Sequence, residues 1–203
     1  MIHRYAGLMA ERTRPTQAER SSAMQAKLVD AATDLLVERG WAATTAVAVC
    51  ERAGCTRGAL LHHYPNLSAL LAHTLESICD DFVAASPGPV TSHVDGIDRL
   101  WRAMGDRRFK AVLEAWSAAS NDPELALEVG PAMLRFAKVM SLENPKGAKR
   151  LDADAKAFVL TAREAMIGLA FGRATNGGQP LGHERIVLAR LRREAAALDA
   201  RRP

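Results

Sequence analysis

Residues 44–71 read TTAVAVCERAGCTRGALLHHYPNLSALL, and this stretch determines the expected fold. Small apolar residues recur at helical spacing at Val47, Cys50 and Ala53, which predicts one buried face of a short helix. Gly54 follows at the position where a left-handed turn costs least. The stretch therefore predicts a short helix that ends in a tight turn.

A second short helix follows this turn. Thr56 can cap its start, because a threonine oxygen accepts a hydrogen bond from an amide of the first helical turn. Pro65 disfavours helical geometry at Tyr64, so the helix ends there. Two short helices joined by a glycine-containing turn predict a helix-turn-helix, a motif whose second helix lies in the major groove of DNA.

Several short motifs in and before this stretch match in one register. They are Glu38-Arg39-Gly40-Trp41, Thr44-Thr45, Ala53-Gly54, Gly58 and His62-His63-Tyr64-Pro65. On these motifs the chain resembles, over residues 24–72, the N-terminal domain of the TetR family of bacterial transcription regulators. The resemblance implies a DNA-binding head, a long connecting helix, and a helical body that binds a small effector and forms a homodimer through its last two helices.

The composition indicates a soluble and largely helical protein. Of its 203 residues, 48% are hydrophobic, 25% are charged and only 5% are aromatic, and no alternating β pattern is present. No apolar run is long enough to span a membrane and no secretory leader is evident, so we expect a cytoplasmic protein. The net charge of +4 permits a nucleic-acid partner but is also common in proteins that bind none.

The three cysteines are Cys50, Cys55 and Cys79, an odd number without the spacing of a metal site. Reduced thiols are therefore expected. Cys50 and Cys55 could form a redox pair, but packing as two small residues of the motif core is the favoured interpretation.

The chain is expected to be all-α and to have three parts. Residues 1–21 form a basic tail, for which a solvated segment is favoured over an arm laid into the DNA minor groove. Residues 22–84 form the helix-turn-helix domain with its connecting helix, and residues 85–203 form the ligand-binding and dimerisation domain after the Ser86-Pro87-Gly88-Pro89 break. Besides the two helices of the motif, helices are expected at 22–39, 67–84, 93–104, 106–120, 123–143, 152–175 and 183–201.

The last two expected helices carry apolar stripes. The small alanines in these stripes would let helices approach closely, and the family resemblance favours a homodimer interface there. The alternative is that both helices only cover the core of their own subunit. The stripes are Phe158, Ala162, Ala165 and Leu169 on one helix, and Ile186, Leu191, Ala195 and Leu198 on the other.

DNA contacts are expected on the two helices of the motif. Arg57 is the strongest candidate, because its guanidinium can pair with a guanine or a phosphate. Threonine hydroxyls and helix N-termini can bind phosphates, Gly58 lets the backbone approach DNA closely, and Ala59 can touch a thymine methyl. For His63 a packing role is an equal alternative. The predicted DNA-binding residues are Thr44, Thr45, Thr56, Arg57, Gly58, Ala59, Leu61, His62, His63 and Tyr64.

Two positions depart from the resembled family. The family usually has a tyrosine where Leu61 stands and a lysine where Leu67 stands, and both commonly contact phosphates. Leucine cannot do so, which weakens the salt-dependent part of DNA binding. Compensation by Arg52, Arg57 and the arginines of the tail is the favoured interpretation, and a weaker binder or a different footprint is the alternative.

Large, soft apolar side chains in the body are candidates for an effector site. Core packing explains most of them, but the resembled family holds a small effector in this domain. Walls of aromatic and methionine side chains suit an apolar or amphipathic molecule. The predicted ligand-binding residues are Trp101, Phe109, Trp116, Met133, Phe136, Met140, Phe158 and Met166, with polar contacts from Ser117, Ser120 and Asn121.

No catalytic or cofactor motif is evident, and a metal site from His62, His63 and His73 is disfavoured because no carboxylate or thiol completes it. The sequence therefore predicts a TetR-like transcriptional repressor without a cofactor. It would bind a palindromic operator in double-stranded DNA as a homodimer and be released by a small effector. The alternatives are a ligand- or protein-binding module with weak or lost DNA binding, and an all-helical enzyme that no set of residues supports.

Overall fold

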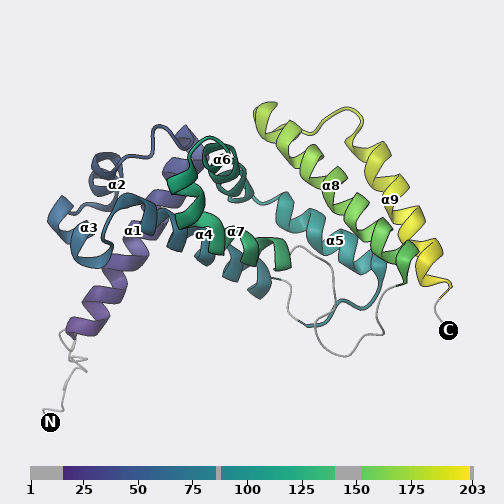
Figure 1. Cartoon of the computed structure of the whole chain (residues 1–203), viewed down its shortest axis with the longest axis horizontal. Coiled ribbons are helices and arrows are strands. Elements are labelled where there is room, and N and C mark those ends of the chain that lie inside the picture. The colour runs from purple at the N-terminus through teal and green to yellow at the C-terminus, as the bar shows by residue number, and fades with distance from the viewer. Residues whose placement is uncertain (1–15, 86–87, 140–151, 202–203) are drawn as a thin grey trace, which may run out of the picture.

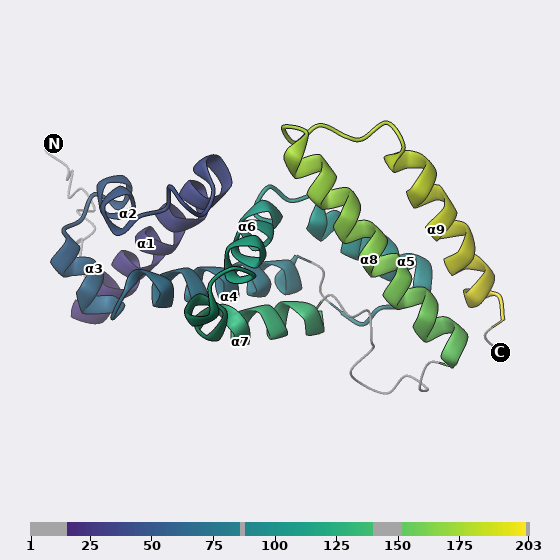
Figure 2. The same cartoon turned by 45° about the horizontal axis from the view of Figure 1, so that its top comes forward.

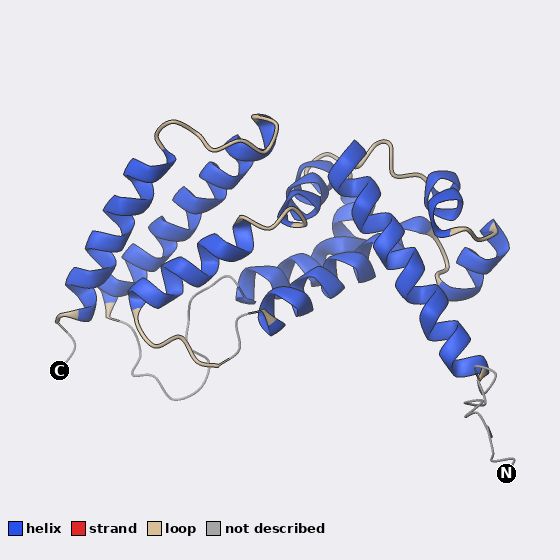
Figure 3. Ribbon diagram, turned by 180° about the vertical axis from the view of Figure 1, so that it is seen from behind, coloured by secondary structure: helices blue, strands red, loops and turns tan. Residues whose placement is uncertain are grey.

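The computed structural model describes residues 16–85, 88–139 and 152–201, and every regular element in these ranges is a helix (Figure 3). The expected all-α fold is therefore confirmed. The helices are α1 (Gln17–Arg39), α2 (Ala46–Ala53), α3 (Arg57–His63), α4 (Leu67–Ala84), α5 (His93–Met104), α6 (Phe109–Ala119), α7 (Pro123–Val139), α8 (Ala153–Thr175) and α9 (Glu184–Asp199).

The first helix begins at Gln17, so the expected start near residue 22 is wrong. Thr16 and Glu19 explain the difference, because they form a capping box. The Glu19 amide donates to the Thr16 hydroxyl at 3.2 Å, and the Thr16 amide donates to the Glu19 carboxylate at 2.6 Å. Residues 1–15 of the expected tail lie outside the described residues.

In the head, α2 and α4 pack against the buried face of α1, and α3 packs against α2. Leu28, Leu35 and Leu36 of α1 are almost fully buried, as their spacing predicts. The buried face of α2 carries Val49, and the expectation that Val47 lies on it is wrong, since 61% of Val47 is exposed. The inward positions of α2 are residues 46, 49, 50 and 53, a helical spacing that excludes position 47.

The remaining helices form two groups. In the first, α6 and α7 pack against α4; in the second, α5, α8 and α9 pack against one another. Figures 1 and 2 show the first group continuing the head and the second beside it, so the molecule is elongated. Contact between α6 and α8 joins the two groups.

Hydrogen bonds from α6 and the turn before it hold the end of α1. The Arg107 guanidinium lies 2.6 Å from Asp34, and the Lys110 ammonium donates to the Val37 carbonyl at 2.7 Å. The Glu114 carboxylate accepts a hydrogen bond from the Trp41 amide at 3.0 Å. The head is therefore attached to the body through α6 as well as through α4.

Gly40 shows how tight this attachment is. Its backbone has φ 77° and ψ −178°, a conformation that is essentially restricted to glycine. A Cβ placed on it would lie 2.8 Å from Glu114 Oε2, the atom that accepts the Trp41 hydrogen bond. Any side chain at this position must therefore displace the carboxylate.

We expect Gly40→Ala to lower the free energy of unfolding by about 2–3 kcal/mol, from backbone strain and from the displaced carboxylate together. Gly54→Ala is the matched control, because Gly54 also has a positive φ, of 65°, but has no atom near its added Cβ. This control should lose only about 1 kcal/mol. Urea unfolding of both variants measures the difference, and equal losses would contradict the contact with Glu114.

The start of α5 is tied to the end of α9 by one carboxylate. Asp199 accepts hydrogen bonds from the His93 amide at 2.8 Å and the Val94 amide at 3.1 Å, and His93 Nδ1 lies 2.7 Å away. Burial acts to raise the pKa of Asp199, but these bonds outweigh it and hold that pKa below its ordinary value. An ionised carboxylate at a helix N-terminus also stabilises the helix dipole.

Most of the apolar stripes on α8 and α9 face the core of their own subunit. Ala162, Leu169, Leu191 and Ala195 are all buried in the single chain. The small alanines Ala162 and Ala195 therefore bring α8, α9 and α5 together, and they are not available to a second copy. Ile186 is the exception, with 69% of its surface exposed.

Candidate nucleic-acid interface

The helix-turn-helix predicted from the sequence is present. The Thr45 hydroxyl accepts the Ala48 amide at 3.2 Å to begin α2, and the Thr56 hydroxyl accepts the Ala59 amide at 3.1 Å to begin α3. Gly54 between them has left-handed geometry. Tyr64 is extended, with φ −136° and ψ 129°, so α3 ends before Pro65 as expected.

The outward face of α3 carries most of the predicted DNA contacts. Arg57, Gly58 and His62 are exposed, while Ala59 and His63 are half-buried. Arg57 has no ion pair or side-chain hydrogen bond within the described part of the chain. Figure 1 shows α3 at the outer end of the head, far from α8 and α9, where a long polymer such as DNA could lie against it.

Thr44 and Tyr64 are placed differently from the rest of the predicted set. The Thr44 side chain is buried, and its hydroxyl donates to the Gly40 carbonyl at 2.8 Å. Tyr64 is also buried, with its hydroxyl 2.6 Å from His73 Nδ1 on α4. Both side chains hold parts of the head together, so we leave them out of the candidate interface.

The neighbouring surface is less basic than the sequence suggests. Leu61 is 47% exposed on α3, whereas Leu67 is half-buried at the start of α4. Arg52, which could compensate for them, donates to Glu38 at 2.6 Å. Because Arg52 is held in this ion pair, Arg57 is the arginine of the motif that is better placed to contact DNA.

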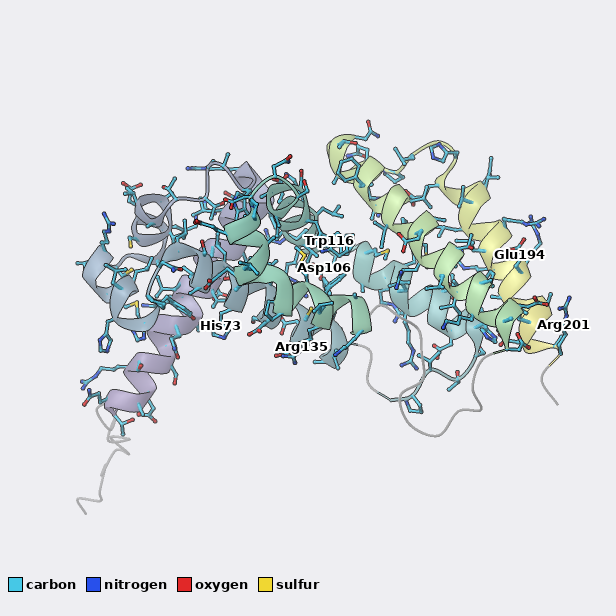
Figure 4. The ribbon with its side chains drawn as sticks, in the orientation of Figure 1. His73, Asp106, Trp116, Arg135, Glu194 and Arg201 are labelled. Carbon is cyan, nitrogen blue, oxygen red and sulfur yellow. The ribbon has the colours of Figure 1, made fainter. Side chains whose placement is uncertain are left out.

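The described members of the predicted ligand-binding set lie in or against one hydrophobic core and come from two groups of helices. Phe109, Trp116 and Phe136 contact one another, with ring centroids 5.6 to 6.4 Å apart, and Phe82 of α4 packs on Phe136 at 6.2 Å. Phe109 and Phe136 are almost fully buried. Trp116, which is labelled in Figure 4, is half-buried. We call these four rings the aromatic cluster; it fills the space between α4, α6 and α7. Met133 on α7 is half-buried, and Met140 lies outside the described residues.

The other three predicted ligand residues lie in the α5, α8 and α9 group. Met166 is fully buried, whereas Trp101 and Phe158 are half-buried. The Arg173 guanidinium lies over the Trp101 ring, 5.2 Å from its centroid, and also bonds the Glu184 carboxylate at 2.5 Å. Sequence analysis missed Arg173, because 72 positions separate it from Trp101 and no local pattern links them.

The polar candidates beside Trp116 are engaged with one another. The Ser120 hydroxyl donates to the Ser117 carbonyl at 2.8 Å, and the Asn121 amide donates to the Ser120 hydroxyl at 3.1 Å. All three are exposed at the end of α6. These hydrogen bonds complete the end of α6.

Comparison with known proteins agrees with the motif. Residues 28–74 match the family model described as bacterial regulatory proteins, tetR family. The chain is also similar to the HTH-type transcriptional regulator CymR of Pseudomonas putida, with 32% identity over 119 residues. This match covers 55% of the chain and 59% of CymR, so the chain spans less than two thirds of that relative. These matches are to regulators and not to enzymes.

Solved structures share the arrangement of helices over most of the chain. A TetR transcriptional regulator from Rhodococcus sp. RHA1 superposes with a TM-score of 0.59 at 17% identity, covering 91% of this chain and 100% of the other. A protein described as the multidrug binding protein EbrR complexed with imidazole gives a TM-score of 0.55 at 21% identity, covering 82% and 93%. At these identities the likeness shows the fold.

Proposed function

We propose that the chain is a transcription regulator of the TetR type, which its helix-turn-helix resembles over residues 28–74, and that it represses transcription by binding an operator through α3. The observation that carries the proposal is the complete helix-turn-helix with Arg57 exposed and unpaired, within the described residues, on the outward face of α3. No helix in the described ranges is long and apolar enough to cross a membrane.

In the proposed complex α3 lies in the major groove. The Arg57 guanidinium pairs with a guanine through two parallel hydrogen bonds, and Gly58 lets the backbone approach the DNA. The exposed Thr45 and Thr56 begin the two helices beside this face, where the backbone amides of the first turns can bind phosphates. Contacts to bases then give specificity, and contacts to phosphates give the register.

We propose that two copies associate through α8 and α9. Leu160 and Phe171 lie three turns apart on α8 and share one face, and they are 40% and 52% exposed. The exposed Ile186 adds an apolar side chain on α9. Burying these side chains against a second copy would place two heads on one DNA, with half-sites about 34–36 Å apart in a near-palindrome.

A small apolar or amphipathic effector in the body would release the DNA. The similarity to EbrR, described as a multidrug-binding protein, supports this part of the proposal. We propose that α6 transmits the effect of the effector to the head. One face of α6 bears Phe109 and Trp116 of the aromatic cluster. Another face bears Lys110 and Glu114, which form hydrogen bonds with Val37 at the end of α1 and with Trp41 just after it. An effector acts on the DNA only if it binds one of two positions of α6 more tightly than the other.

Selection on random genomic fragments, followed by sequencing, tests the DNA-binding part. The proposal predicts enrichment of a palindrome by the full chain at low salt, with binding that weakens as the salt concentration rises. Absence of enrichment from low to physiological salt would overturn it. That result would favour the second candidate, a ligand- or protein-binding module, which is motivated by leucine at positions 61 and 67 and by the ion pair that holds Arg52.

Leu61 gives a direct test of the phosphate contacts. We expect Leu61→Lys to raise the affinity for the selected palindrome about fivefold at low salt, and to steepen the slope of log affinity against log salt by about 0.9. Leu61→Gln is the control, because it is polar and of similar size but adds no charge, so the slope should not change. Fluorescence anisotropy across a salt series measures both. An unchanged slope for the lysine variant would place Leu61 away from the DNA backbone.

A further inference from the structure

The turn of the helix-turn-helix brings two cysteines together. The Cys55 amide donates to the Cys50 carbonyl at 3.0 Å, and the Gly54 amide donates to the Glu51 carbonyl at 3.3 Å, with Gly54 in the left-handed conformation. This pair of bonds defines a Schellman motif. Cys50 and Cys55 occupy the two positions whose side chains meet across such a turn.

The two thiols differ in exposure. Cys50 is 7% exposed, whereas Cys55 is half-buried and so accessible to a small solute. Neither forms a disulfide in the structure. Cys79 lies far along the chain on α4, is also buried, and has its pKa raised to about 11 by burial. Cys50 and Cys55 therefore form the candidate reactive pair, and the buried Cys79 serves as a comparison thiol that is expected to stay reduced.

The surroundings agree with close contact between the two thiols. Burial and, after it, the neighbouring Cys55 thiol raise the pKa of the Cys50 thiol, and the Arg57 guanidinium acts in the opposite direction. Arg57 is thus near enough to the pair for its charge to reach Cys50. Because thiolate is the reactive form, the more exposed Cys55 is the better first nucleophile and Cys50 the better second one.

We propose that Cys50 and Cys55 are a peroxide-sensitive pair that closes to an intrachain disulfide within the helix-turn-helix. The Cys55 thiol releases its proton and the thiolate attacks one peroxide oxygen. The O–O bond breaks, the sulfur becomes a sulfenic acid, and the other oxygen takes up a proton and leaves as water or an alcohol. The Cys50 thiol then releases its proton and its sulfur attacks the sulfenic sulfur. The S–O bond breaks, and the hydroxyl takes up a proton and leaves as water while the S–S bond forms. The two thiols lose two electrons and the peroxide gains them.

Disulfide formation would disturb α3. Bringing two sulfurs from contact to bonding distance pulls Cys55 toward α2, and Cys55 directly precedes Thr56, the cap of α3. Arg57 follows one residue later, so its guanidinium moves relative to a DNA groove. This consequence rests on the proposed function, whereas formation of the disulfide does not.

The chemical step is tested on the full chain with hydrogen peroxide. After treatment, titration of the unfolded protein should find one thiol where the reduced chain has three, and the intact mass should fall by about 2 Da. Peptide mapping should place the bond between Cys50 and Cys55 and leave Cys79 reduced. Cys50→Ser and Cys55→Ser should each prevent the loss of 2 Da, and Cys79→Ser should not. Three remaining thiols, a gain of oxygen without a disulfide, or a bond between two chains would each overturn the proposal.

The consequence for DNA is tested with the palindrome selected by the reduced protein. Oxidation should weaken binding about tenfold, which is the size of effect expected when one base is no longer contacted, and dithiothreitol should restore it. The Cys55→Ser variant should bind with or without peroxide. Unchanged binding by a protein shown to carry the disulfide would overturn the effect on α3. If the reduced protein selects no DNA, the proposed function fails. The intact mass and the thiol titration would still show whether the disulfide forms between Cys50 and Cys55.

Discussion

Replacing Phe136 with alanine is expected to lower the free energy of unfolding by about 3–5 kcal/mol, the largest stability effect we predict for this chain. The Phe136 side chain is 2% exposed and its ring touches three others, those of Phe82, Phe109 and Trp116. Removing it leaves a cavity at the junction of α4, α6 and α7, because the remaining rings, held by α4 and α6, cannot close into the space.

Leu127→Ala is the matched control for this prediction. Leu127 lies on the same helix but is 82% exposed, so its truncation should change stability by no more than about 0.5 kcal/mol. Phe136→Leu retains most of the volume and should lose about 1.5 kcal/mol at most. Urea unfolding followed by circular dichroism measures all three variants. A loss below about 1 kcal/mol for Phe136→Ala would show that the ring borders open space, as a wall of an effector site would.

The helices could be predicted from the sequence because residues at or next to their ends determine where they start and stop. Gly54 and Pro65 mark where α2 and α3 end, and the expected bounds of α4 and α5 agree with the structure. The start of α1 is also written locally, in the capping box of Thr16 and Glu19, but the arginines of the adjoining segment favoured a tail. A capping box is therefore stronger evidence for a helix start than local composition.

Side-chain placement could be predicted only in part. Helical spacing alone predicted that Val47 lies on the buried face of α2, and the family resemblance predicted that Thr44 and Tyr64 contact DNA. In the structure Val47 is exposed and the other two side chains are buried, because the neighbouring helices and loops decide which side chains face inward. The Thr44 hydroxyl bonds Gly40, and the Tyr64 hydroxyl bonds His73. Interactions between distant residues, such as Glu114 with Trp41, leave no signal in a single sequence.

Replacing Arg57 with alanine is expected to weaken binding to the selected palindrome by about 5- to 150-fold, the range for removing one bidentate pairing with a base. Arg57 is exposed at the start of α3 and unpaired within the described residues, so its removal takes no ion pair from the fold. Unfolding midpoints of the variant should therefore equal those of the parent. Arg102→Ala, which removes an exposed arginine from α5 in the body, should leave DNA binding unchanged.

The salt series separates the two roles that Arg57 could have on DNA. If Arg57 pairs with a base, its truncation relaxes the preference at one position of the palindrome; if it pairs with a phosphate, truncation weakens all sequences alike and reduces the salt slope by about 1. Because Arg57 is the first residue of α3, and the N-terminal residues of a recognition helix reach the base edges, we expect relaxed specificity at one base pair in each half-site. A uniform loss of affinity with a shallower slope would assign Arg57 to the backbone instead. If the variant binds the palindrome with the same affinity and specificity as the parent, then α3 does not lie in the major groove as proposed, and the proposed mode of recognition is wrong.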